Sequence, residues 1–239
     1  MKKKLSTLFF LFNLLLYPQQ SGRIVYKVLQ DSTYDNSEFI NKMKQTIGNS
    51  YKEVIKKTNK NYEIAKDFQY FLDFNSNESL YYWNEIMPDE TIPNTYFSSA
   101  VLLGGGKGKY YYHKKKDTLF LQTKTLDRSY KRVVIPTERN HFYITKQTDT
   151  ILGYRVIKAE KGLTQIWFTP DIPLPFGPFK WVGFPGVVLK FKYKKRLIIA
   201  EKIILYKKNK YIKKPEKGKF ISESDLLNKY RKIDLSRFN

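Results

Sequence analysis

The segment Trp167–Leu189 constrains the fold more than any other part of the chain. It reads Trp-Phe-Thr-Pro-Asp-Ile-Pro-Leu-Pro-Phe-Gly-Pro-Phe-Lys-Trp-Val-Gly-Phe-Pro-Gly-Val-Val-Leu, with five prolines and three glycines. Each proline fixes its own φ and biases the preceding residue toward extended geometry, which excludes a helix interior or a central strand. We call this segment the proline arm and expect a stiff, extended ribbon with turns at its glycines. So much apolar surface on a rigid backbone predicts a defined docking place, within this protein or on a partner.

The proline arm supplies two sets of candidate residues. Asp171, an acid before Ile-Pro, is expected to cap a turn through its own backbone. The positions expected to shape the arm are Pro170, Asp171, Pro173, Pro175, Gly177, Pro178, Gly183, Pro185 and Gly186. The candidate ligand- or partner-binding residues are its aromatics, Trp167, Phe168, Phe176, Phe179, Trp181 and Phe184. Aromatics at this density either line a groove or interface, or plug the open face of the protein's own sheet.

The first residues indicate export. Three lysines after Met1 precede an apolar tract from Leu5 to Tyr17, which is too short to span a bilayer and suits a secretory signal. We therefore predict a signal peptide over residues 1–21 and a single domain over 22–239, in the periplasm or on the periplasmic face of the outer membrane. An N-terminal amphipathic or anchor helix is the alternative. No later segment is apolar enough for a transmembrane span.

The composition of the chain limits which classes of partner are expected. The chain has 239 residues, no cysteine and a net charge of +22, so its stability has to come from its core without disulfides. Of the 44 basic residues 36 are lysine, whereas nucleic-acid recognition favours arginine, so nucleic acid is disfavoured as a partner. An anionic surface or an acidic partner fits the charge, as does a simply solvated basic surface.

Periodicity predicts a mainly β (α+β) domain, a curved antiparallel sheet or half-barrel with short helices at its ends. Residues 35–47 form an expected amphipathic helix, and Ser222 to Asp225 is a capping box opening a terminal helix. A period of two indicates strands over 23–29, 62–74, 79–83, 119–123, 130–135, 141–145, 154–159, 163–168, 189–194 and 197–205. Leu189, Phe191 and Tyr193 alternate with lysines, which is typical of a half-buried antiparallel strand.

Motifs for chemistry are weak. Gly104–Lys109 lacks the spacing of a phosphate-binding loop, and a glycine-rich hairpin turn is the favoured interpretation. His113 and His141, the two histidines, fall on separate expected strands with no cysteine to join them in a metal site. No Gly-x-Ser-x-Gly elbow is present. We predict no catalytic residues, no metal and no cofactor.

The chain resembles the GLPGLI family of exported Gram-negative envelope proteins. The naming motif stands here as Gly183-Phe-Pro-Gly-Val-Val188, preceded by Trp167-Phe-Thr-Pro-Asp-Ile-Pro173 and Phe176-Gly-Pro-Phe-Lys180. Gly153-Tyr-Arg-Val-Ile-Lys-Ala159 and Asn77-Glu-Ser-Leu-Tyr81 also match, with Val156 where the family often has cysteine. The resemblance implies an envelope protein without established activity, often encoded beside outer-membrane TonB-dependent receptors. By analogy only, the expected curved antiparallel sheet capped by helices is similar to the fold of periplasmic lipoprotein carriers.

Three functions follow as hypotheses. The first is a non-enzymatic accessory or binding protein that uses the proline arm to contact an apolar ligand or an outer-membrane receptor. The second is a periplasmic carrier that holds a lipid or apolar peptide in a half-barrel, which requires a dry cavity of several hundred Å³. The third is a hydrolase with an unrecognised site, which requires His113 and His141 to converge with a carboxylate.

Overall fold

The computed structural model describes residues 21–225 apart from 88, 126–127, 135–140 and 223, and also residue 228. The predicted signal peptide therefore lies outside the described residues except for Ser21, which already begins β1. The helical elements are α2 (Ser37–Ile47), η1 (Gly48–Ser50), α3 (Tyr51–Ala65), α4 (Asn94–Leu103) and η2 (Lys114–Lys116). The strands are β1 (Ser21–Gln30), β2 (Gln69–Phe74), β3 (Glu78–Trp83), β4 (Lys109–His113), β5 (Thr118–Thr125), β6 (Arg128–Val134), β7 (Tyr143–Ile151), β8 (Tyr154–Lys161), β9 (Thr164–Thr169), β10 (Val187–Tyr193), β11 (Arg196–Tyr206) and β12 (Lys219–Phe220).

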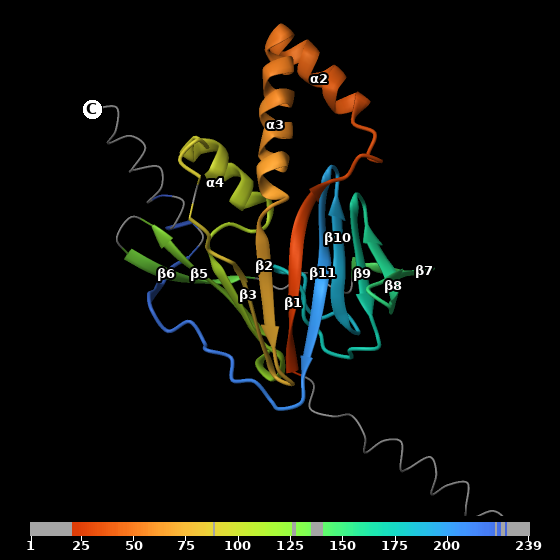
Figure 1. Ribbon diagram of the computed structural model, residues 1–239, viewed down its shortest axis with the longest axis vertical. Helices are drawn as coiled ribbons and strands as arrows, with labels where there is room; N and C mark the ends of the chain where they lie inside the picture. The colour runs from red at the N-terminus through yellow and green to blue at the C-terminus, as the bar shows by residue number, and fades with distance from the viewer. Residues whose placement is uncertain are drawn as a thin grey trace, which may run out of the picture.

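The strands form one open, 12-stranded sheet in the order β12-β6-β5-β4-β3-β2-β1-β11-β10-β9-β8-β7. Two meanders, β2 to β6 and β7 to β11, meet on the two sides of β1, and the sheet curls strongly (Figure 1). This confirms a mainly β domain. The expectation of purely antiparallel pairing is wrong at one edge, because the two residues of β12 pair in parallel with β6.

The two faces of the sheet are covered differently. On the inner face lie Ile24, Tyr26 and Val28 of β1, all fully buried beneath the proline arm and the ends of α3 and α4. Alternation along the strand turns Arg23 and Lys27 to the outer face. Part of the outer face is covered by residues 207–218, which we call the strap. Ile212 of the strap is buried in a second cluster with Leu80, Tyr111 and Phe120.

The helices depart from expectation in two places. The predicted strand over 62–74 is wrong in its first part, because Tyr62, Ile64 and Ala65 form the last turn of α3 and β2 starts only at Gln69. Buried residues at 62 and 65 are three apart and share a helix face, which the run of apolar residues concealed. Helix α4 was not expected, since its apolar residues lie around most of its circumference and give little periodicity.

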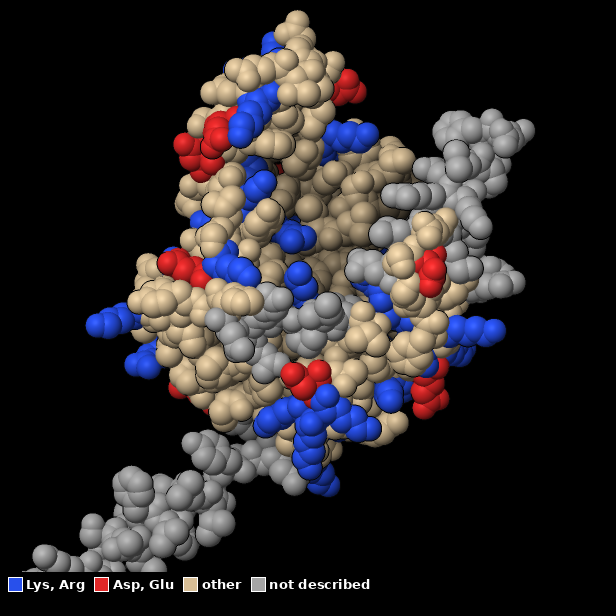
Figure 2. All heavy atoms as spheres, turned by 180° about the vertical axis from the view of Figure 1, so that it is seen from behind, with Lys and Arg blue, Asp and Glu red and all other residues tan. Residues whose placement is uncertain are grey.

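The expected helix over 35–47 is confirmed as α2, and with α3 it forms a helical hairpin that projects beyond the end of the sheet (Figure 1). The terminal helix expected after Ser222 lies mostly outside the described residues. Its capping contact is present, since the Asp225 N–H donates to Ser222 Oγ at 3.0 Å. Viewed from behind, the surface is hollowed beneath the helical hairpin, and Lys and Arg side chains lie in the hollow (Figure 2).

Candidate functional site

The proline arm joins β9 to β10, and its middle, residues 170–186, is neither helix nor strand, as its prolines predict. The Leu174 N–H donates to the Ile172 carbonyl at 2.7 Å and the Phe176 N–H to the Leu174 carbonyl at 2.8 Å, so Pro173 and Pro175 stand at the centres of consecutive three-residue turns. The Val188 N–H donates to the Phe176 carbonyl at 2.9 Å. The arm therefore folds back on itself rather than running straight.

The backbone geometry of the proline arm requires glycine at two positions, Gly183 and Gly186. Gly183 has φ +89°, in the left-handed region that favours glycine. A Cβ at Gly186 would lie 1.9 Å from the Thr169 carbonyl oxygen, so only glycine lets these two segments meet. The expectation for Asp171 is not what the structure shows: its own N–H donates to Thr169 Oγ1 at 3.2 Å, so the threonine hydroxyl caps this turn.

Four of the six candidate aromatics, Phe168, Phe176, Phe179 and Phe184, are buried in this protein's own core on the inner face of the sheet. Phe176 is fully buried, with its ring centroid 6.2 Å from that of Phe74 and 6.1 Å from that of Tyr112. Phe168 and Phe184 stack on each other at 5.9 Å. Trp181 is half-buried and stacks on Phe191 at 4.8 Å. The arm is thus the internal plug of the sheet, and contact with a ligand or partner through these residues stays a prediction.

Trp167 stands apart from the other candidates. Trp167 is paired with Lys190 of β10 and Lys158 of β8, and its ring lies beside both of these lysines, which places it on the outer face of the sheet. Lys190 Nζ lies 4.2 Å from its ring centroid, and Lys158 Nζ lies 5.9 Å away. These two lysines cover the ring, which explains how a tryptophan on the outer face is only 8% exposed.

The remaining sequence motifs do not converge on a chemical site. Gly104–Lys109 is not a hairpin turn: it connects α4 to β4, and the rings of Tyr70 and Phe179 press against Gly104 and Gly105. His113 lies in β4 and His141 just before β7, with seven strands between β4 and β7 in the order of the sheet. Within the part of the chain that the structure describes, no group of three His, Asp or Glu residues can hold a metal ion.

An open pocket that the sequence did not reveal lies between the helices and the β10–β11 turn. Its volume is about 410 Å³, inside the range of roughly 300–1,000 Å³ that is usual for small-molecule sites. We call it the helix–turn pocket. It is lined by Tyr34, Asn36, Phe39, Met43, Val54, Ile55, Thr58, Asn59, Tyr62, Leu103, Tyr193, Lys194, Lys195 and Arg196.

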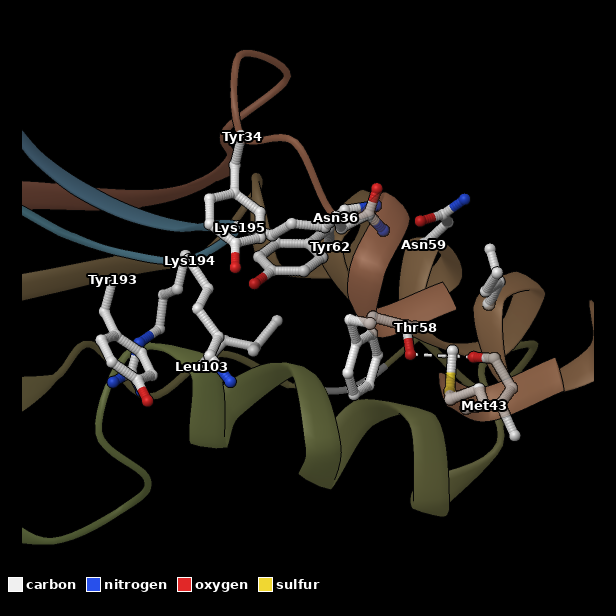
Figure 3. A pocket seen from close by; sticks show the side chains of 14 residues that line it. Tyr34, Asn36, Met43, Thr58, Asn59, Tyr62, Leu103, Tyr193, Lys194 and Lys195 are labelled. Carbon is white, nitrogen blue, oxygen red and sulfur yellow. Dashed lines mark hydrogen bonds between the residues drawn. The ribbon is translucent and has the colours of Figure 1, made fainter. Parts of the chain in front are cut away.

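The helix–turn pocket is polarised along its length. Tyr193 and Lys194 of the β10–β11 turn lie at one end, Met43 of α2 lies at the other, and Leu103 stands between them opposite Tyr34 and Tyr62 (Figure 3). Among the residues that the structure describes, its lining holds three basic residues and neither a carboxylate nor a histidine. Such a site favours an apolar or amphiphilic occupant over acid–base chemistry.

The apolar wall from α2 is left uncovered by the protein. Every residue of α2 is at least partly exposed, and Phe39 is 53% exposed although it sits on the apolar side of an amphipathic helix. Val54 of α3, across the pocket, is 41% exposed. A helix of this kind ordinarily buries its apolar stripe, so this wall has room for a further apolar body.

At the basic end of the pocket, Arg196 is the residue whose pKa is shifted by burial. Its guanidinium lies 5.2 Å from the Phe191 ring centroid and 5.9 Å from that of Phe179. Burial disfavours the charged form and lowers the pKa of Arg196 below its ordinary value, although four tyrosines around it act in the opposite direction. Its Nε is buried and has no hydrogen-bond partner among the described residues.

No helix among the described residues is long and apolar enough to cross a membrane. No protein-family model and no curated protein matches the chain. Two solved structures of PNGF-II, in space groups P21 and C2, resemble it with a TM-score of 0.56 at 14% identity. The match covers 87% of this chain but 32% of the PNGF-II chain, so this chain spans about a third of that protein. At this identity the likeness supports the β-rich fold alone.

Proposed function

We propose that this chain is an exported binding protein of the cell envelope that holds an apolar or amphiphilic small molecule in the helix–turn pocket. The observation that carries the proposal is the exposed apolar wall of that pocket, formed by Phe39, Val54 and their neighbours on two helices. Burying it under a ligand would release the same free energy that core packing does, about 25 cal/mol per Å² of apolar surface.

The envelope role rests on the GLPGLI resemblance. The motif glycines Gly183 and Gly186 each have a local geometric reason in the arm, and membership of that family is proposed from the resemblance alone. The family's association with TonB-dependent receptors makes an accessory role in uptake or outer-membrane assembly the cellular context that we propose. The analogy with lipoprotein carriers belongs to the same proposal. The inner face of the sheet is filled by the arm, which leaves no room for the cavity that a half-barrel carrier requires. The proposed ligand therefore lies beside the sheet, among the helices.

Binding of the neutral apolar dye Nile red to the purified protein tests the ligand-binding role. We expect saturable binding that falls at least tenfold in Ile55→Trp, which fills the pocket from α3. The matched control is Leu205→Trp, at an exposed position of β11 outside the pocket, which should bind the dye as the unaltered protein does. Absence of saturable binding, or equal binding by both variants, would contradict the proposal.

The envelope context has a separate test. Fractionation of Gram-negative cells that express a tagged chain should place it in the periplasm or with the outer membrane, with residues near 1–21 removed. A pull-down from detergent-solubilised envelope should retain an outer-membrane receptor. A cytoplasmic, unprocessed chain would overturn export, and a pull-down without a membrane protein would overturn the accessory role.

A further inference from the structure

Three consecutive basic residues close one end of the helix–turn pocket. Lys194 and Lys195 form the two-residue connection between β10 and β11, and Arg196 follows as the first residue of β11. Within the described chain none of the three forms an ion pair, whereas Lys192 two residues earlier binds Asp31 at 2.5 Å. The fold therefore neutralises the lysine on the strand and leaves the charges beside the pocket without counter-ions.

Of these three residues, Arg196 has a buried N–H, at Nε, that lacks a hydrogen-bond acceptor among the described residues. A buried N–H without a partner loses its hydrogen bond to water without a replacement, and the cost is greater when the group is charged. Its side chain is braced by the rings of Phe191 and Phe179, so it cannot extend freely into water as a surface arginine does. A planar guanidinium fixed in this way is suited to a carboxylate, which it binds through two parallel hydrogen bonds.

The opposite end of the pocket has the complementary property. Met43 and Phe39 of α2 and Val54 of α3 form an apolar wall, and no described residue that lines this end of the pocket is charged. A ligand matching both ends has a negative head and an unbranched apolar tail. A neutral oil would leave Arg196 unpaired, and a cationic amphiphile would be repelled by the basic turn.

We propose that the occupant of the helix–turn pocket is a single-chain amphiphile with a carboxylate head, bound by Arg196 and flanked by Lys194 and Lys195, with its chain running between α2 and α3. This inference rests on the proposed function and specifies the ligand class of the same site.

Isothermal titration of the full-length mature protein with three probes of equal chain length tests the inference. Laurate should bind about tenfold or more tightly than dodecanol, since a charge-assisted hydrogen bond contributes roughly 1.5–3 kcal/mol. Dodecyltrimethylammonium should bind more weakly than either. Equal affinities for laurate and dodecanol would overturn the inference and leave the proposed function standing. If neither binds, the proposed function itself fails.

Substitution locates the head-group site. Arg196→Gln should reduce laurate affinity about tenfold, to the level of dodecanol, while dodecanol binding is unchanged. Arg196→Lys keeps the charge but not the planar fork and should recover only part of the loss. Arg155→Gln, an exposed arginine on β8, removes the same charge outside the pocket and should leave laurate binding unaltered. Unchanged binding in Arg196→Gln, in a variant whose thermal midpoint shows that it is folded, would overturn the assignment.

Discussion

The ring of Tyr70 lies directly on Gly104: a Cβ at that glycine would stand 1.9 Å from Tyr70 Cζ. The Tyr70 hydroxyl donates to the Val101 carbonyl at 2.9 Å, which ties the end of α4 to β2. Burial raises the pKa of Tyr70 well above its ordinary value, so this hydroxyl stays a donor at physiological pH. The glycine-rich connection thus serves packing between a helix and the sheet rather than binding phosphate.

Gly104→Ala should destabilise the protein by more than about 2 kcal/mol, because the added methyl group overlaps a fully buried ring that has no space to retreat. Chemical denaturation followed by tyrosine and tryptophan fluorescence measures this. Ser98→Ala, at an exposed position of the same helix, is the control and should change the free energy of unfolding by less than about 0.5 kcal/mol. A neutral Gly104→Ala would show that the contact with Tyr70 is not tight.

Asp73 should make the stability depend on pH in the acid range. Burial alone would raise its pKa, but hydrogen bonds from Arg23 at 2.6 and 2.8 Å, together with Lys210 at 3.1 Å, outweigh burial and hold the pKa below its ordinary value. The stabilisation is therefore present above the unfolded-state pKa of about 4 and is lost as pH falls through the lower folded-state pKa.

Asp73→Asn should lower the free energy of unfolding at neutral pH by about 1–3 kcal/mol and flatten its slope in the acid range. Denaturation series at several pH values compare this variant with Asp67→Asn, which makes the same charge change at an exposed position. The interpretation fails if the two variants have the same pH dependence.

A substitution in the β7–β8 turn should increase the stability of the protein. Leu152 occupies it with φ +52°, ahead of Gly153 with φ +83°, and a leucine in the left-handed region costs roughly 1–2 kcal/mol. Leu152→Asn supplies the residue that such turns prefer and should stabilise the protein by about 1 kcal/mol, seen as a higher thermal midpoint. Leu163→Asn, at an exposed turn leucine without a positive φ, should give no gain.

Two residues of the proline arm should respond differently to truncation. Phe176→Ala removes a fully buried ring and should cost about 3–5 kcal/mol, enough to impair folding. Trp181→Ala removes a half-buried ring and should cost less, so it is the variant suited to testing partner binding by the arm. Equal losses of stability would show that Trp181 is as integral to the core as Phe176.

The sequence predicted that the middle of the proline arm is neither helix nor strand, because proline and glycine act on the backbone locally. It did not predict that the arm folds back on itself through turns centred on Pro173 and Pro175. It did not predict that residues 62–65 belong to α3 rather than to a strand, because Tyr62 and Ile64 would be buried in either structure. The burial of Ala65, three residues after Tyr62 on the same face of α3, is what distinguishes the helix.

The helix–turn pocket could not be predicted from the sequence for a different reason. Its walls come from α2, α3, the end of α4 and the β10–β11 turn, and no spacing in the sequence joins Phe39 to Arg196. Two signals were present separately: an amphipathic helix at 35–47 and a basic turn at 194–196. Their juxtaposition depends on β1 pairing with β11, a contact between the two ends of the domain.

The partial exposure of every residue in α2 has a kinetic consequence. Detaching this helix breaks little packing, so it should swing open at a small fraction of the free energy that melts the sheet. A guest could then enter and leave within the lifetime of the folded protein, with β1 and β11 intact. Amide hydrogen exchange should be fast along 37–47 and slow in β1, and a bound guest should slow it along α2 first.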